Sequence, residues 1–249
     1  MKVKTISLPM LLTSLIFLTV LLVGSALAQS PTIRLADPKT GDAIEFDAES
    51  FDNGTGSCSL IHNDSRTAAK FQVDENRGIY PWITITLNTG QSHISWAGRD
   101  FFGEIKIKLI LGEKGLVLAG GSPEEKVFAW PAGPKEALPE RAKAAICLSN
   151  ANQIANACWD YAEKTNDHFP HTITELVPVY IPEDKKSIFI SPFATDKTKP
   201  SYTLLLPDAD AEEAPKTDPK AILIRCDYAS KFGRSIVHVE GLAETTKGE

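Results

Sequence analysis

Apolar and polar residues alternate with period two through much of the chain between positions 30 and 131. Such spacing is typical of strands that bury one face. In the clearest case, EIKIKLIL, the apolar positions share one side: Ile105, Ile107, Leu109 and Leu111. Further candidate strands have the sequences TIRL, AIEF, CSLI, AAKFQV, WITITL, HISWA, GLVLAG and KVFAW. We expect WITITL and HISWA to form a hairpin, and the eight or so strands to build an all-β sandwich-like domain or a partly open barrel over residues 30–131.

Spacing of three and four residues replaces this alternation between positions 137 and 162. Pro139 is tolerated in a first helical turn, Glu140 follows it, and no further Pro or Gly occurs before Pro170. The predicted buried face is made of small residues and three larger ones, Ile146, Ile154 and Tyr161. Small residues suit close packing on a sheet better than a coiled-coil seam. We therefore predict one long helix that lies on a small antiparallel sheet.

The segment CLSNANQIANACWDYAEKTNDHFP, residues 147–170, resembles a segment of type II secretion pseudopilins and pseudopilin-like bacterial proteins. ALPERAKA before it is similar to the run that links the family's membrane stem to its globular head. ELVPVYIP, FISPFATD, SYTLLLP, AILIRCD and GRSIVHVEG follow in the order of the head's loop and strands. The positions that carry the resemblance are Cys147, Ser149, Asn150, Gln153, Ile154, Tyr161, Ala162, Phe169 and Pro170.

The resemblance implies a pilin-like head over residues 137–244, in which one long helix packs on a small antiparallel sheet, with residues 245–249 as a tail. Together with the β domain, this gives an α+β fold class with two domains. The linker between them is PAGP, residues 131–134, because Pro and Gly block both helix and strand there. The resemblance also implies a structural or interaction role at the bacterial cell envelope.

Residues 1–28 have the pattern of a secretory signal peptide. Lys2 and Lys4 precede an apolar run over residues 6–24, and Ala26-Leu27-Ala28 forms a small-x-small cleavage site. A retained single-span anchor is the alternative, because the apolar run is close to the ~20 residues that a span needs. Either interpretation places the rest of the chain outside the cytoplasm, periplasmic or secreted. A pilin subunit would carry a Gly-Phe-x-x-x-Glu entry to its helix, which this chain lacks, so the resemblance does not imply filament assembly.

The charge of the chain argues against two classes of partner. There are 26 Lys and Arg against 32 Asp and Glu, and the net charge is −6. Removing Lys2 and Lys4 with the leader leaves 24 basic residues against the same 32 acidic ones, a charge of about −8. Affinity for nucleic acid and for anionic lipid is dominated by Lys and Arg contacts. We therefore expect protein partners at the envelope, no nucleic acid, and a membrane only if the leader is retained.

The four cysteines offer one kind of cross-link in an exported chain, where disulfides persist. Cys147 and Cys158 are eleven residues apart on the predicted helix, about 16 Å along its axis, so they cannot pair with each other. Cys226, in the strand AILIRCD, is a possible disulfide partner for either Cys147 or Cys158. Cys58 lies in the β domain. The alternative is that all four are small buried thiols.

Two groups of residues are candidate metal ligands. The late acidic stretch offers Asp208, Asp210, Glu212 and Glu213 as calcium ligands, and some pseudopilins bind calcium in a late loop. Their spacing does not match an EF-hand. His168 and His171 have the spacing of zinc ligands, but Pro170 prevents their presentation on one helix. We expect a solvated acidic loop and surface histidines, hence no cofactor, with calcium the remaining candidate.

The sequence contains no Gly-x-Ser-x-Gly elbow, Cys-x-x-Cys, His-Glu-x-x-His or phosphate-binding glycine loop. We therefore expect no catalytic residues and predict a non-catalytic structural or interaction protein. The alternative is an extracytoplasmic binding module whose β domain recognises a glycan or a peptide, with Trp82 and Trp96 as the stacking platform. A hydrolase of unrecognised type is the second alternative.

Overall fold

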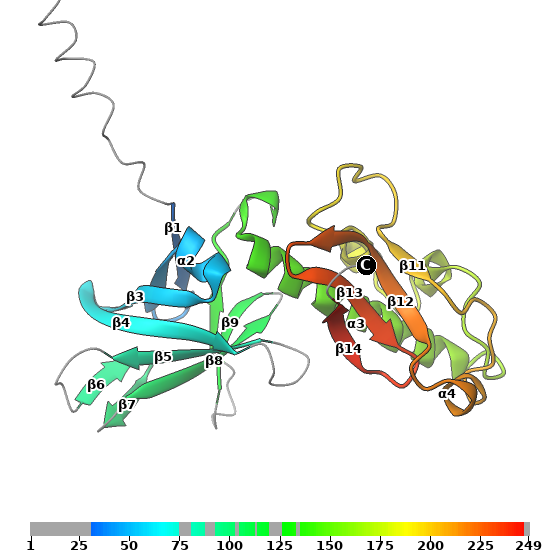
Figure 1. Ribbon diagram of the computed structural model, residues 1–249, viewed down its shortest axis with the longest axis horizontal. Coiled ribbons are helices and arrows are strands. Elements are labelled where there is room, and N and C mark those ends of the chain that lie inside the picture. The colour runs from blue at the N-terminus through cyan, green and yellow to red at the C-terminus, as the bar shows by residue number, and fades with distance from the viewer. Residues whose placement is uncertain are drawn as a thin grey trace, which may run out of the picture. The chain divides into compact units, whose positions relative to one another are not determined.

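Eight antiparallel strands close into a barrel in the N-terminal half of the chain (Figure 1). The structure is a computed structural model that describes residues 31–74, 81–87, 93–102, 105–112, 114–119, 126–132 and 135–246. Around the barrel the strands follow the order β1, β10, β9, β8, β5, β4, β3 and β2. Their bounds are β1 Thr32–Ala36, β2 Ala43–Asp47, β3 Thr55–His62, β4 Ser65–Asp74, β5 Trp82–Leu87, β8 Lys106–Gly112, β9 Gly115–Leu118 and β10 Val127–Ala129.

Alternate positions of these strands fill the barrel interior, as the period-two pattern predicted for single strands. In β8, for example, Ile107 and Leu109 are buried, whereas Lys106 and Lys108 are exposed. The largest fully buried side chains of the barrel are Leu35, Ile44, Phe46, Phe51, Leu60, Ile83, Ile85, Trp96, Ile107, Leu109 and Phe128. The ring closes where Ala36 of β1 pairs with Ala129 of β10. Closure removes the edge strands that an open sheet would expose.

The fold class predicted from the sequence, α+β with a sandwich-like domain and a pilin-like head, is wrong. The protein is mostly β, with the closed eight-stranded barrel, small sheets and only about 24% helix. Alternation shows that each strand buries one face, but it does not say whether strands stack as two sheets or close on themselves. Closure here depends on β10, a strand of only three residues that pairs with both β1 and β9.

The predicted hairpin of WITITL and HISWA is also wrong. β5 pairs with β4 and β8 inside the barrel. HISWA instead contributes β6 (His93–Trp96), which pairs with β7 (Arg99–Phe102) in a separate two-stranded sheet. A short helix that the sequence analysis did not predict, α2 (Ala48–Asn53), follows β2. The Asp47 carboxylate accepts a hydrogen bond from the backbone N–H of Ser50, which caps α2, and Phe51 of α2 packs into the barrel.

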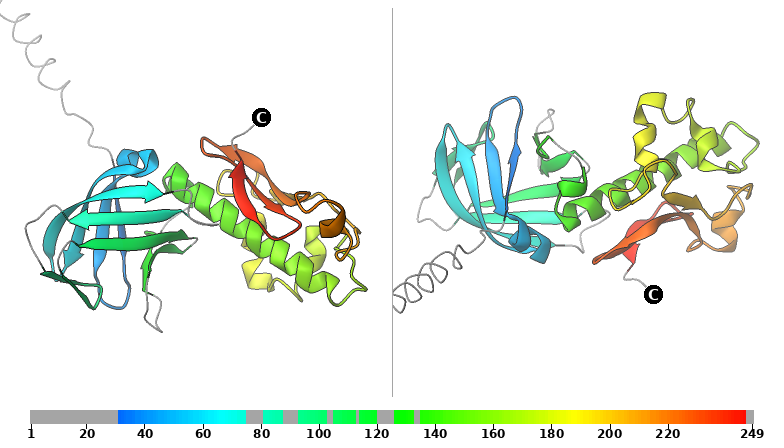
Figure 2. Two further views of the ribbon diagram at one scale, coloured as in Figure 1. Left: turned by 60° about the horizontal axis from the view of Figure 1, so that its bottom comes forward. Right: turned by 90° about the horizontal axis from the view of Figure 1, so that it is seen from above.

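The C-terminal half contains one long helix, α3 (Glu140–Ala162), which contacts the sheet formed by β11, β12, β13 and β14 (Figure 2). The sheet strands are β11 Tyr202–Leu204, β12 Ile222–Ser230, β13 Gly233–His238 and β14 Ala243–Thr246. Shorter helical segments are η1 Lys135–Ala137, η2 Ile173–Leu176, η3 Glu183–Phe189 and α4 Ala214–Thr217. β14 includes residues that the sequence analysis had assigned to a tail, because its sequence AETT has only one apolar residue.

The long helix belongs to two hydrophobic cores. Ala142 and Ala145 pack with the barrel residues, and α3 contacts β8. From Cys147 onwards, the buried residues of α3 pack with those of β12 and β13 instead. The small side chains on this face allow close approach to the sheet. One helix therefore links the barrel to the C-terminal sheet across residues 140–162.

The predicted signal peptide, residues 1–28, lies outside the described residues, so its cleavage or retention stays a prediction. Within the part of the chain that the structure describes, no helix has the length and apolar character required to cross a membrane.

Candidate ligand pocket

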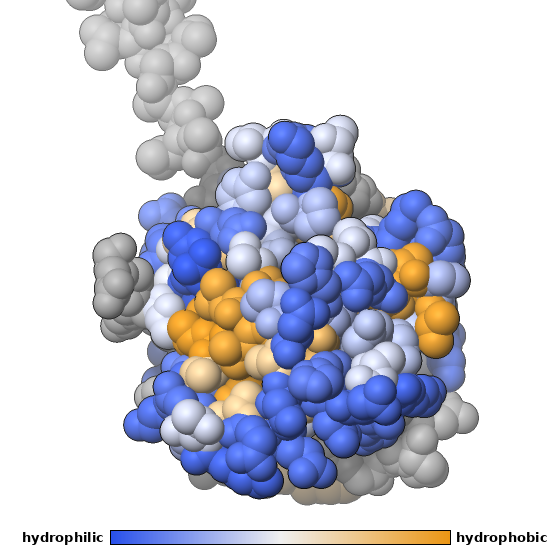
Figure 3. Space-filling view, turned by 90° about the vertical axis from the view of Figure 1, so that its right-hand side faces the viewer, coloured by the Kyte–Doolittle hydropathy of each residue, from blue (hydrophilic) through white to orange (hydrophobic). Residues whose placement is uncertain are grey.

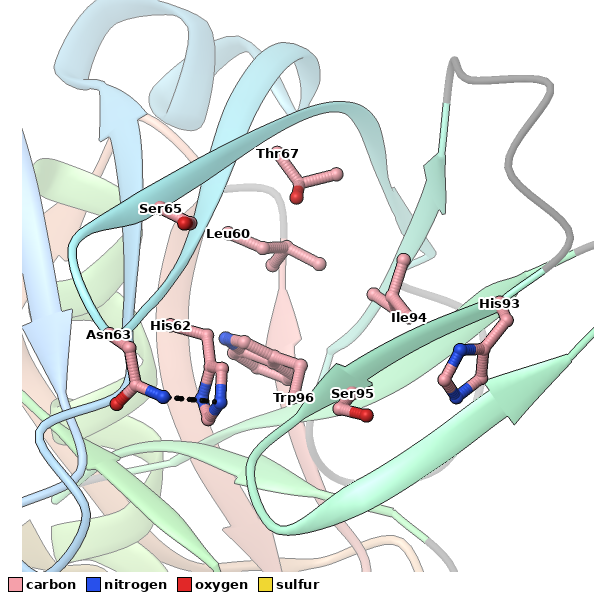
Figure 4. A pocket seen from close by; sticks show the side chains of 9 residues that line it. All are labelled: Leu60, His62, Asn63, Ser65, Thr67, His93, Ile94, Ser95 and Trp96. Atoms are coloured by element: carbon pink, nitrogen blue, oxygen red, sulfur yellow. Dashed lines mark hydrogen bonds between the residues drawn. The ribbon is translucent and has the colours of Figure 1, made fainter.

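A cavity of about 330 Å³ lies between the β3–β4 hairpin and strand β6. Its volume is at the lower end of the range for small-molecule sites, and the mouths of β-barrels are common positions for such sites. Figure 4 shows the side chains that surround it. They are Leu60, His62, Asn63, Ser65, Thr67, His93, Ile94, Ser95 and Trp96.

Trp96 holds β6 against the barrel and forms part of the cavity wall. Only 1% of its surface is exposed, and its ring stacks on Phe128 at 4.6 Å between centroids, with the planes 3° apart. Its indole N–H donates to the carbonyl of Ile61 at 3.2 Å, so its polar atom is satisfied inside the core. These contacts fix the position of β6, which carries Ser95 and His93 beside the hairpin residues (Figure 4).

His62, at the end of β3, is held by a buried carboxylate. Its Nδ1 lies 2.6 Å from Oδ1 of Asp42, a residue only 2% exposed, and the other Asp42 oxygen accepts from the Thr40 hydroxyl at 2.9 Å. The amide Nδ2 of Asn63 lies 3.0 Å from His62 Nε2 (Figure 4). These partners assign the tautomer: Nδ1–H donates to Asp42, and Nε2 accepts from Asn63. The imidazole is therefore fixed at the rim with one acceptor nitrogen.

His93 and Ser95 of β6 share a second carboxylate. Nε2 of His93 lies 3.2 Å from Oδ1 of Asp100, and the Ser95 hydroxyl donates to the same oxygen. The hydrogen bond from Ser95 contributes most, and the one from His93 adds to it; together they hold the pKa of Asp100 below its usual value. The His93 ring stacks on Phe102, whose side chain is 72% exposed. In a serine triad the histidine would lie between serine and carboxylate, whereas here the carboxylate lies between Ser95 and His93.

The described residues that line the cavity include no Lys, Arg, Asp or Glu. Three hydroxyl groups, two imidazoles and one amide provide its polar atoms, and Leu60, Ile94 and Trp96 provide its apolar wall. A ligand carrying a full charge would find no opposite charge among these side chains. The lining instead suits an uncharged ligand with several hydroxyl groups and one apolar face.

The structure does not bring Trp82 and Trp96, the tryptophans proposed as a stacking platform, together. Trp82 begins β5 and is partly exposed, on the strand face opposite to the buried Ile83 and Ile85. Trp96 packs in the barrel core. One tryptophan is thus on the outside of the barrel wall and the other inside it.

The four predicted calcium ligands have protein partners. Asp210 accepts from the backbone N–H groups of Glu212 and Glu213, and both glutamates form ion pairs with Lys216. An Asp208 oxygen lies 2.7 Å from Nδ1 of His171, and this hydrogen bond raises the pKa of His171. Within the described part of the chain, no group of three or more His, Cys, Asp or Glu side chains is arranged to hold a metal ion. Calcium binding stays a prediction that the structure does not test.

All four cysteines are free and buried in the structure. The Cys147 thiol of α3 lies 3.0 Å from the Ser191 hydroxyl, and the neighbouring Cys226 thiol of β12 raises the pKa of Cys147. Burial alone raises the pKa of Cys158 and of Cys58, in each case to about 12. Of the two pairings that the sequence left open, the structure thus brings Cys226 to Cys147.

The sequence analysis named Trp96 as a candidate ligand-binding residue but missed His62, Asp42, His93 and Ser95. The only local signal was the turn segment HND at 62–64, in which Asn63 and Asp64 adopt positive φ. No family model, curated protein or solved structure matches the chain. The functional argument therefore depends on the chemistry of the site itself.

Proposed function

We propose that this protein is an extracytoplasmic binding module whose barrel holds an uncharged, hydroxyl-rich ligand, such as a sugar unit of a glycan. The observation that carries this proposal is the cavity beside β6, with its hydroxyl and imidazole lining and its apolar wall. The lining residues come from secondary-structure elements that are fixed by Trp96 and Asp42. A site on fixed elements loses little entropy when a ligand binds.

The polar side chains have distinct roles in this proposal. Ser65 and Thr67 each offer a hydroxyl that donates or accepts a hydrogen bond with a sugar hydroxyl. The Ser95 hydroxyl donates to Asp100 and can therefore accept a hydrogen bond from a sugar hydroxyl. The Asp42 carboxylate fixes the ring of His62, and Nε2 of that ring accepts from the Asn63 amide and so orients Asn63 at the cavity. The side chains of Leu60 and Ile94 contact the C–H face of the sugar ring.

Glycan-array binding by the purified full chain tests the proposal. We expect binding to a limited set of glycans, and its loss in Ser95→Ala and in His62→Gln. His171→Gln is the matched control, because His171 also pairs with an aspartate but is exposed and lies outside the cavity. An array with no signal above background, or equal binding by His62→Gln, Ser95→Ala and wild type, would refute the proposed site.

A second candidate function follows from the C-terminal half, for which the sequence resembles pseudopilins: a structural or interaction protein of the cell envelope. The supporting observation is exposed apolar surface. Val179 is 73% exposed in the segment ELVPVYIP, and Leu242 is 49% exposed beside β14. Figure 3 shows one larger and one smaller group of apolar residues on a mostly hydrophilic face. Envelope protein co-purification that Val179→Ser abolishes, and that His62→Gln leaves intact, would favour this role over ligand binding.

A further inference from the structure

Cys147 and Cys226 both belong to the hydrophobic core between α3 and the C-terminal sheet. Both residues are buried, Cys147 at 2% exposure and Cys226 at 0%. Cys147 lies in the third turn of α3, and Cys226 lies in the middle of β12. The proximity of the two thiols raises the pKa of Cys147 and lowers that of Cys226.

Two neighbouring side chains fix this arrangement independently. Tyr202 of β11 is the cross-strand partner of Cys226, and its hydroxyl donates to the backbone carbonyl of Cys147 at 3.4 Å. The Ser191 hydroxyl lies 3.0 Å from the Cys147 sulfur, and it also lowers the pKa of the Cys226 thiol. Strand pairing, helix packing and the Ser191 hydroxyl thus bring the two cysteine side chains close together.

The other cysteines do not share this arrangement. Cys158 lies eleven residues further along α3, about 16 Å from Cys147. Cys58 packs in the barrel core. A disulfide requires sulfur atoms about 2.05 Å apart, so only side chains that already meet can form one without backbone movement.

We propose that Cys147 and Cys226 form a disulfide bond that fastens α3 to β12. The oxidant is an external disulfide, such as oxidised glutathione or a disulfide-bonded thiol oxidase. The Cys226 thiolate attacks one sulfur of this disulfide, forms a mixed disulfide and releases one thiolate. The Cys147 sulfur, after losing its proton, then attacks the Cys226 sulfur and displaces the second thiolate. Two electrons and two protons pass from the cysteine pair to the oxidant, which leaves as two thiols.

The cross-link closes a loop of about 80 residues, which includes η2, η3, β11 and α4. Long closed loops lose more conformational entropy in the unfolded state, so the bond stabilises the folded state. We expect reduction of the oxidised protein to lower its Tm by roughly 5–15 °C. This inference is independent of the ligand proposal, because no cysteine lines the cavity.

Peptide mapping of the full chain after treatment with oxidised glutathione tests the bond directly. Trypsin releases residues 226–231 as one peptide and residues 144–164 as another, and the second contains both Cys147 and Cys158. Cysteine variants are therefore needed to show whether Cys147 or Cys158 carries the cross-link. We expect the cross-linked peptide in wild type and in Cys158→Ser, its loss in Cys147→Ser, and two free thiols instead of four by thiol titration.

Cys158→Ser is the matched control, because it lies on the same helix and is equally buried. A cross-linked peptide that persists in Cys147→Ser would assign the bond to Cys158 and overturn the proposal. Four titratable thiols in the oxidised wild type would also overturn it. If Cys147→Ser fails to fold, the wild-type protein can still be used. Fragmentation of its cross-linked peptide in the mass spectrometer, between residues 148 and 157, shows which cysteine carries the cross-link.

Discussion

Nδ1 of His62 lies 2.6 Å from Oδ1 of Asp42, and this pair joins the end of β3 to the start of β2 at the rim of the cavity. Asp42 is almost fully buried, whereas His62 is partly exposed at 41% of its side chain. The carboxylate therefore acts as a fixed support from inside the barrel, and the imidazole presents its other edge to the cavity. This orientation is the basis of the first prediction.

Asp42→Asn removes the negative charge that holds the imidazole. We expect glycan affinity to fall at least tenfold and stability to fall by about 1–3 kcal/mol, because the lost hydrogen bond is buried and charge-assisted. Isothermal titration with the best array ligand measures affinity, and urea unfolding measures stability. Asp196→Asn is the control, since that carboxylate is exposed and bonds Thr198. Unchanged affinity in a folded Asp42→Asn protein would contradict the role of the pair.

Gly115, the first residue of β9, is required by close backbone approach. Its φ is +143°, and a Cβ there would lie 1.9 Å from the carbonyl oxygen of Phe128. Gly115→Ala should therefore lower the free energy of unfolding by more than about 2 kcal/mol, since β9 and β10 would have to separate at the closure of the barrel.

Gly41→Ala is the matched control for this substitution. Gly41 also has a positive φ, +75°, but no atom lies within 4 Å of its Cβ position. We expect only the backbone penalty of roughly 1–2 kcal/mol there. Equal Tm values for the two alanine variants would show that the contact with Phe128 relaxes without loss of strand pairing.

Much of the secondary structure could be predicted, because local patterns determine it. The inward residues of β8 and the long helix α3 follow from periodicity within their own segments. Barrel closure does not, because it depends on the pairing of Ala36 with Ala129, positions 93 residues apart. The edge strand β14 was missed because its polar sequence buries only Ala243.

The ligand pocket was harder to predict than the fold. Serine, threonine and asparagine in turns are ordinary turn residues in a sequence, and nothing local distinguishes those that line a cavity. His62 and Ser95 become neighbours only because β6 leaves the barrel order and docks beside the β3–β4 hairpin. Trp96, predicted as an exposed stacking surface, is instead the residue that makes this docking possible.

His238, at the end of β13, should make stability depend on pH. Burial opposes protonation, but hydrogen bonds from its ring to Glu244 at 2.9 Å and to the Lys220 carbonyl at 2.7 Å outweigh it and raise its pKa. Because the folded pKa exceeds the unfolded one, this contribution is complete below about pH 6.5 and is lost as pH rises through the folded value. We expect stability to decline above neutral pH.

Glu244→Gln tests this pH dependence, because it removes the charged partner and leaves the ring in place. The difference in urea midpoint between wild type and variant should be larger at pH 6 than at pH 8.5. The corresponding difference in free energy of unfolding should stay below about 1 kcal/mol, since Glu244 is half exposed to solvent. A difference that is constant across this range would show that protonation of His238 does not contribute.

Asp52 of α2 caps a helix that begins 88 residues later in the chain. Its carboxylate accepts from the backbone N–H groups of Glu140 at 3.2 Å and Arg141 at 3.0 Å, whereas Pro139 at the N-cap provides no side-chain bond. In return, the Arg141 guanidinium donates to the carbonyls of Phe51 and Asp52 at 3.0 and 2.9 Å. The barrel and the long helix therefore satisfy each other's unpaired backbone groups.

Asp52→Ala should lower stability by about 1–2 kcal/mol and reduce amide protection at residues 140–143, because both a cap and a favourable charge at the helix N-terminus are lost. Asp160→Ala is the control, because the helix dipole has the opposite effect on a negative charge at that end of α3. It removes a negative charge near the C-terminus of the same helix, where the dipole disfavours it, so stability should stay equal or rise slightly. Hydrogen exchange and urea unfolding measure both variants. Equal loss of stability in the two would contradict capping by Asp52, since only its carboxylate meets the free N–H groups of α3.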